Sequence, residues 1–142
     1  MNKGVSIGLG VDGSASNDSG NLLNEAKQAL YLQRVTETKN KLNSRHMLWL
    51  ATAGGARALN RHDIGSVKIG NSADFAIYDL SSLELAGAVD DPIGALIFCG
   101  PLRTKYTICN GKVLSEDDKI NNLNLEKTIL KHNLFSRNIL NP

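Results

Sequence analysis

The chain has 142 residues, a hydrophobic content of 42%, a charged content of 21% and a formal net charge of +2. This length suits one ordinary domain, and the composition is that of a globular protein rather than a disordered or fibrous one. The small net charge gives no support for a nucleic-acid or membrane-surface partner. The two cysteines are too few for a disulfide framework, and no apolar run approaches the ~20 residues of a membrane helix. We therefore expect a soluble, cytoplasmic protein.

The most informative stretch runs from Val5 to Asn17. It begins as a short apolar strand that ends in small residues, with one carboxylate, Asp12, at its exit. Glycines beside a lone acid allow backbone or a ligand to approach closely, because glycine has no Cβ. A polar loop then leads to a helix. A strand, an acid and a loop before a helix are typical of the carboxyl end of a parallel strand, where α/β proteins place catalytic groups.

Two other interpretations of this stretch remain open. Gly8, Gly10 and Gly13 spell G-x-G-x-x-G, the pattern of a dinucleotide-binding turn. That turn also requires a second strand ending in an acid about 20 residues further on, whereas Leu22–Val35 keeps a helical pattern through this window. An acid at position 12 would in addition repel the pyrophosphate. The third interpretation is a glycine-rich turn with a purely structural role.

The rest of the chain alternates helical and strand-like patterns. We predict helices over Leu22–Val35, capped by Ser19 or Asn21, and over Arg45–Ala53, capped by Ser44 and interrupted by Gly54-Gly55; a helix that starts at Asp90–Pro92 and ends by Gly100-Pro101; and a closing helix over Leu123–Leu140. We predict strands over Ile64–Ile69 and Ala73–Asp79 joined by a hairpin at Gly70-Asn71, and a second hairpin in which Asn110-Gly111 joins Tyr106–Cys109 to Lys112–Leu114.

Residues 8–17 resemble the end of the eighth barrel strand in the amidohydrolase superfamily, in the branch of 8-oxoguanine deaminase, guanine deaminase and the triazine hydrolases. Two further blocks, around Ala73-Asp74 and Asp91–Gly111, are similar to the same branch. The resemblance implies an α/β fold: the last βα unit and following helices of a (β/α)8 barrel, plus part of a small β-sandwich. The implied divisions are the last strand and barrel helices (1–62), sandwich strands (63–83), a helix returning to the barrel (84–105), a sandwich hairpin (106–116) and a helical tail (117–142).

The resemblance also implies a chemistry. The family would use one divalent metal, zinc or iron, to deaminate an aminopurine-like or triazine-like small molecule by hydrolysis. By motif match, Asp12 would bind the metal and carry a proton as the catalytic residue. Ser14 and Asn17 would contact the substrate, although both could equally serve to fix the loop.

The sequence lacks the other ligands of such a site, because it contains no His-x-His pair. We interpret His46, His62 and His132 as surface or capping residues, and Cys99 and Cys109 as small core residues. We therefore expect the C-terminal portion of a longer enzyme, which does not retain the metal by itself. It would either be a homo-oligomer or await a missing N-terminal barrel portion. The alternative is a catalytically inert remnant or assembly fragment of such an enzyme.

Overall fold

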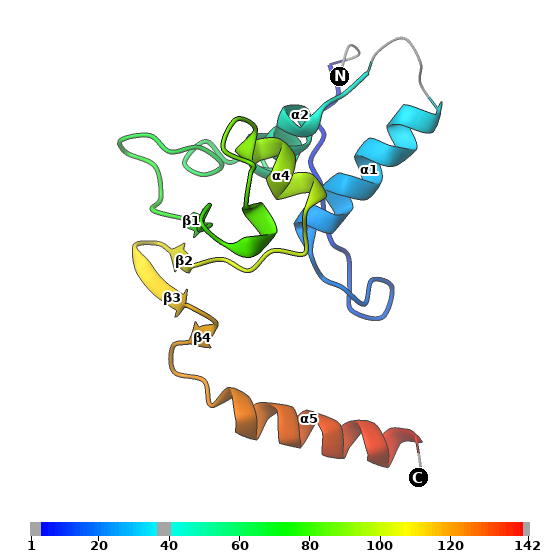
Figure 1. Cartoon of the computed structure of the whole chain (residues 1–142), viewed down its shortest axis with the longest axis vertical. Helices are drawn as coiled ribbons and strands as arrows, with labels where there is room; N and C mark the ends of the chain where they lie inside the picture. Colours follow the sequence, from blue (N-terminus) through cyan, green and yellow to red (C-terminus); the bar gives the residue numbers. More distant parts are fainter. Residues whose placement is uncertain (1–3, 37–40, 141–142) are drawn as a thin grey trace.

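A computed structural model describes residues 4–36 and 41–140 (Figure 1). Helices and strands are mixed along the chain. In order they are α1 (Leu22–Thr36), α2 (Ser44–Trp49), the π-helical turn η1 (Leu50–Gly54), α3 (Gly55–Ala58), β1 (Phe75–Ile77), the 3-10 turn η2 (Leu83–Leu85), α4 (Pro92–Phe98), β2 (Tyr106–Cys109), β3 (Lys112–Glu116), β4 (Lys119–Ile120) and α5 (Leu125–Leu140).

The hydrophobic core lies where α1, α2, η1 and α4 pack together. Its buried members are Ala26, Leu30, Met47, Leu50 and Ile97. Ala26 and Leu30 are four residues apart, so both lie on the side of α1 that faces α2 and α4. The predicted helix over Leu22–Val35 is confirmed as α1. Its start is capped by Asn21, whose Oδ1 accepts hydrogen bonds from the backbone amides of Leu23 and Asn24.

The second predicted helix is confirmed, but its cap and its interruption are wrong. Asn43 is the N-cap. Its side chain accepts a hydrogen bond from the backbone amide of His46, and Nδ1 of the His46 ring accepts one from the backbone amide of Asn43. Ser44 is the first helical residue. Gly54 and Gly55 do not break the helix, because both keep right-handed helical angles and carry it from η1 into α3.

The strands form one antiparallel sheet in the order β1-β2-β3-β4. The hairpin at Asn110-Gly111 is confirmed: it joins β2 to β3, with φ of 47° and 76° at its two central residues. The hairpin at Gly70-Asn71 is wrong, because β1 pairs with β2 and residues 64–69 form no strand. Gly65 instead packs against η1 and α3, where a Cβ would lie 2.8 Å from that of Ala56.

The strand predicted from Val5 has no sheet partner in the described part of the chain. Residues 5–11 run as an elongated segment past α2 toward the loop before α1 (Figure 1). The amide of Leu9 donates to the carbonyl of Leu50 at 3.2 Å, so this segment is held by η1 and not by another strand. A strand needs a neighbouring backbone, and the described strands all pair with one another elsewhere.

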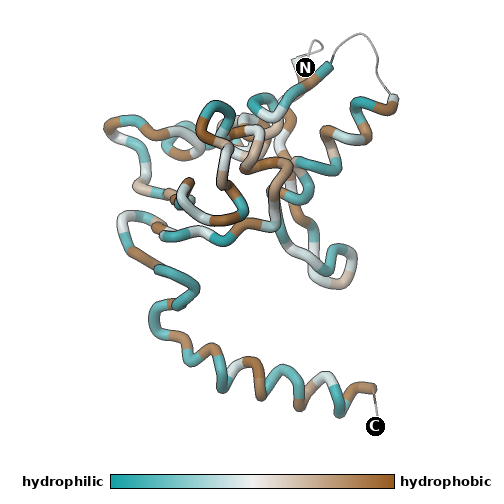
Figure 2. The backbone as a smooth tube through the Cα atoms, in the orientation of Figure 1, coloured by the Kyte–Doolittle hydropathy of each residue, from teal (hydrophilic) through white to brown (hydrophobic). Residues whose placement is uncertain are grey.

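The closing helix is confirmed as α5, which begins two residues later than predicted. It projects away from the rest of the molecule, and none of its residues is buried (Figure 1). Figure 2 shows hydrophobic and hydrophilic positions alternating along it. None of the helices in the described ranges is both long enough and apolar enough to cross a membrane.

Candidate functional site

Asp12 lies exposed in the loop between the elongated segment 5–11 and α1. Its backbone is in the left-handed region, with φ of 59°, a conformation that aspartate tolerates better than most residues. Its Oδ1 accepts a hydrogen bond from the backbone amide of Gly13 at 2.8 Å. None of the ion pairs between described residues involves Asp12. The carboxylate is therefore fixed at one oxygen and open to a ligand.

The electrostatics of this loop favour the ionised carboxylate. The backbone amide of Gly13, and next the hydroxyl of Ser16, lower the pKa of Asp12 below its ordinary value. Hydrogen bonds to the charged form stabilise it relative to the neutral acid. Asp12 is thus a carboxylate at neutral pH. That is the state in which it can bind a cation or accept a proton.

The residues after Asp12 form a tight turn centred on the carbonyl of Gly13. This oxygen accepts from the amide of Ser16 at 3.0 Å, from the Ser16 hydroxyl at 3.1 Å and from the amide of Asn17 at 2.9 Å. Ser14 lies exposed in the same turn. The structure thus keeps Asp12, Ser14 and Asn17 within one short loop.

Asn17 is engaged at both ends of its side chain. Its Nδ2 donates to Oε1 of Glu25 at 2.7 Å, and its Oδ1 accepts from the amide and the hydroxyl of Ser19. Glu25 belongs to the first turn of α1 and is a residue of this site that the sequence interpretation missed. The available signal was an acid four residues after the Asn21 cap, in the first turn of the helix that follows the loop.

The described residues do not make a complete metal centre. A catalytic zinc site uses three protein ligands, and residues 4–36 and 41–140 contain no group of three His, Cys, Asp or Glu side chains placed to hold an ion. His46 belongs to the capping box of α2, as the sequence predicted, while His62 and His132 are exposed. Asp12 therefore does not belong to a three-ligand group among the described residues.

The cysteines are not core residues. Cys99 and Cys109 are both exposed. Cys99 follows the last residue of α4, and Cys109 ends β2 beside the hairpin turn. Both positions lie at the end of an element, outside the packed helices that form the core.

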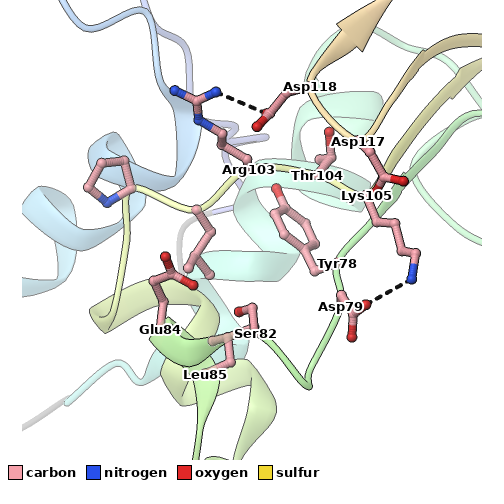
Figure 3. A pocket seen from close by; sticks show the side chains of 12 residues that line it. Tyr78, Asp79, Ser82, Glu84, Leu85, Arg103, Thr104, Lys105, Asp117 and Asp118 are labelled. Atoms are coloured by element: carbon pink, nitrogen blue, oxygen red, sulfur yellow. Dashed lines mark hydrogen bonds and ion pairs between the residues drawn. The ribbon is translucent and has the colours of Figure 1, made fainter.

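A cavity of about 370 Å³ lies away from Asp12, between η2, the segment 101–105 and the β3–β4 turn (Figure 3). Figure 3 shows Lys105 directed at Asp79 and Arg103 at Asp118, in ion pairs of 2.8 Å and 3.0 Å. The Lys105 ammonium holds the pKa of Asp79 well below its usual range. None of the residues that line this cavity belongs to the Asp12 loop.

Comparison with known proteins identifies the ancestry of this loop. The profile of the amidohydrolase family matches residues 1–114. The 8-oxoguanine deaminase of Pseudomonas aeruginosa is 41% identical over 129 residues, which are 91% of this chain and 28% of the relative. Hydroxydechloroatrazine ethylaminohydrolase of Pseudomonas sp. (strain ADP) is 42% identical over 117 residues, 78% of this chain and 24% of the relative.

Solved structures agree with these relatives. An adenosine deaminase from Xanthomonas campestris with bound zinc superimposes with a TM-score of 0.87 at 28% identity, covering 97% of this chain and 32% of that one. Atrazine chlorohydrolase from Arthrobacter aurescens, complexed with zinc, gives a TM-score of 0.82 at 35% identity, covering 90% and 29%. This chain thus spans less than a third of each of these four proteins.

The dinucleotide-binding interpretation finds no support in these matches, and the described strands contain no parallel pair. The chain belongs to the amidohydrolase family.

Proposed function

We propose that this chain supplies the Asp12-bearing part of a metal-dependent hydrolase that removes an amino group from an aminopurine-like ring. The observation that carries the proposal is the geometry of Asp12: an exposed, ionised carboxylate at the exit of the segment 5–11, fixed at one oxygen by Gly13. The similarity to 8-oxoguanine deaminase supports this class of substrate. A triazine-like ring is the second candidate, supported by the similarity to the atrazine-degrading enzymes.

In this proposal the remaining metal ligands come from protein outside these 142 residues, because the described residues contain no group of three His, Cys, Asp or Glu side chains placed to hold an ion. Both solved structures compared above contain zinc, which makes zinc the first candidate and iron the second. A bound divalent cation would supply hydroxide near neutral pH by lowering the pKa of water. The part assigned to Asp12 is that of one ligand and of the group that takes up a proton and passes it to the departing amine.

Ser14 and Asn17 are the proposed substrate contacts in the same loop. Ser14 is exposed and can turn its hydroxyl toward a ligand beside Asp12. Asn17 could touch a substrate only by giving up its bond to Glu25 or to Ser19. Ser14 is therefore the better candidate of the two.

The proposed architecture is the end of a (β/α)8 barrel with part of a β-sandwich. The segment 5–11 would be a barrel strand once neighbouring strands flank it, and the sheet β1–β4 would belong to the sandwich. Exposed apolar side chains on the segment 5–11 support a missing neighbour, because Val5 is 65% and Ile7 is 41% exposed. Such a surface favours association with further barrel protein or with a second copy of the chain. The cytoplasmic location stays a prediction.

A chimera tests the proposal. The part of the Pseudomonas aeruginosa 8-oxoguanine deaminase that aligns with this chain is replaced by this chain, and ammonia release is measured with 8-oxoguanine, adenosine and a triazine. We expect release from at least one substrate, about one bound divalent metal per molecule, and a loss of at least ~1000-fold in kcat on Asp12→Asn.

The matched control is Asp18→Asn, which makes the same chemical change at an exposed acid of the same loop. We expect this variant to keep the activity of the chimera, because it leaves Asp12 and Ser14 intact. A folded, active chimera that tolerates Asp12→Asn would refute the role of Asp12.

The inert-remnant alternative is tested on the chain alone. It is supported by the lack of a three-ligand group among residues 4–36 and 41–140. We expect the purified chain to hold less than one equivalent of zinc or iron and to release no ammonia from aminopurines. An active chimera together with an inactive isolated chain favours a part of an enzyme over a remnant.

A further inference from the structure

Three hydrogen bonds, linked through Asn17 and Gly13, connect helix α1 to the carboxylate of Asp12. Glu25 accepts from the side-chain amide of Asn17 at 2.7 Å. The backbone amide of Asn17 donates to the carbonyl of Gly13 at 2.9 Å, and the amide of Gly13 donates to Oδ1 of Asp12 at 2.8 Å. Each link joins a group near the helix to one nearer the carboxylate.

The first link has a fixed direction. A carboxylate can only accept hydrogen bonds, so the atom of Asn17 that faces Glu25 must be its NH2 group. The opposite atom, Oδ1, accepts from the backbone amide of Ser19, which can only donate. Both ends therefore select one orientation of the Asn17 amide, and the bond to Glu25 is charge-assisted and partly buried.

These three hydrogen bonds start at Glu25, in a part of α1 that packs into the core. Glu25 lies directly before Ala26, which is fully buried together with Leu30 in the core. Asn21 caps the same turn by accepting from the amides of Leu23 and Asn24. Residues 12–16, which carry the Asp12 carboxylate, are all exposed. No packing against the core therefore holds this loop in place.

We infer that Glu25 and Asn17 are positioning residues that hold the Asp12 loop against α1. Without this link the turn at Gly13 would be free to open, and the carboxylate would lose its fixed direction. The inference rests on the proposed function only for the consequence that this direction matters to the reaction. The link itself is a property of this chain and is tested without metal, partner or activity.

The test measures backbone amide exchange by NMR in the full chain and in three variants. Glu25→Ala removes the acceptor, Glu25→Gln keeps an acceptor oxygen, and Gln28→Ala alters an exposed residue of the same helix as a control. We expect Glu25→Ala to speed exchange at Ser16 and Asn17, whose amides bond Gly13, by about tenfold. Exchange at the amides of Ala29 and Leu30, inside α1, serves as the internal reference.

The outcomes separate positioning from a general effect on stability. Faster exchange at Ser16 and Asn17 with an unchanged α1, restored by Glu25→Gln, supports the inference. Unchanged exchange in Glu25→Ala, or an equal rise throughout α1, overturns it. In the chimera, Glu25→Ala is expected to lower kcat with little change in KM. An inactive chimera would count against the proposed function, while the exchange rates still decide whether the link holds the loop.

Discussion

Gly8 lies directly against the backbone of Gly55: a Cβ placed on Gly8 would be 2.6 Å from the Gly55 Cα. This contact joins the segment leading to Asp12 to the junction of η1 and α3. Packing against Gly55 therefore requires a glycine at the first position of the G-x-G-x-x-G pattern. At the other two positions nothing lies within 4 Å of a Cβ placed on Gly10 or Gly13. The pattern that resembles a phosphate-binding turn therefore contains one sterically required glycine.

The first prediction concerns this contact. We expect Gly8→Ala to lower the free energy of unfolding by about 1–3 kcal/mol, because the new methyl group meets backbone that cannot rotate away. Gly10→Ala is the matched control and is expected to change it little, since its Cβ would point into open space. Urea denaturation of the three proteins measures the difference. Equal stability of the two variants would contradict the close approach.

The second prediction concerns the core. Leu30 is fully buried, while Leu32, two residues further along the same helix, is 66% exposed. We expect Leu30→Ala to cost about 2–5 kcal/mol through lost burial and the cavity it leaves. Leu32→Ala is expected to change stability by no more than ~0.5 kcal/mol. A comparable loss in both variants, measured by denaturation, would show that the core is not where α1 faces α2 and α4.

The third prediction distinguishes two candidate caps of α2. Asn43→Ala removes the side chain that accepts from the amide of His46 and is expected to cost about 0.5–2 kcal/mol. Ser44→Ala replaces the first helical residue with a better helix former and should cost little. Thermal denaturation followed by circular dichroism compares the two. The reverse order would restore Ser44 as the cap.

The fourth prediction concerns pH. Arg61 donates two hydrogen bonds to the Asp63 carboxylate, of 2.7 Å and 2.6 Å, and these lower the pKa of Asp63 to about 2. Since the folded-state pKa is below the unfolded value, this pair stabilises the fold above pH ~4 and loses its effect as pH falls toward about 2. Both side chains are about half exposed, so the effect on stability is small.

A carboxyl NMR titration checks this pair directly. In Arg61→Ala we expect the pKa of Asp63 to rise toward its ordinary value. Arg103→Ala is the control, because Arg103 pairs with Asp118 and not with Asp63. A pKa of Asp63 that stays low in Arg61→Ala would contradict the assignment of the shift to that bond.

Local signals predicted several elements correctly. The 3.6-residue spacing of apolar residues located α1, the Asp91–Pro92 start located α4, and Asn110-Gly111 located the hairpin between β2 and β3. Each of these depends on residues close in sequence, such as a cap, a proline at the first turn or two positive φ angles. For the same reason the motif around Asp12 identified the family before any fold was known.

The errors arose where distant residues decide the outcome. The alternation over Ile64–Ile69 resembles a strand, yet β1 takes its partner from residues 106–109. Gly54-Gly55 resembles a helix break, yet these glycines stay helical where they pack against the segment 5–11: a Cβ on Gly54 would lie 2.8 Å from the carbonyl oxygen of Ile7. Glycine's small size mattered here more than its freedom of conformation.

The sequence by itself determined the family and the elements whose hydrogen bonds close within a few residues, and it singled out Asp12 as the candidate site residue. Only the three-dimensional structure decided how the Asp12 loop is held, because Asn17 reaches Glu25, eight residues away, where the loop folds back on the first turn of α1. Helices and tight turns are encoded in short stretches of chain. Contacts between stretches depend on which buried surfaces come together, and a single sequence does not state that pairing.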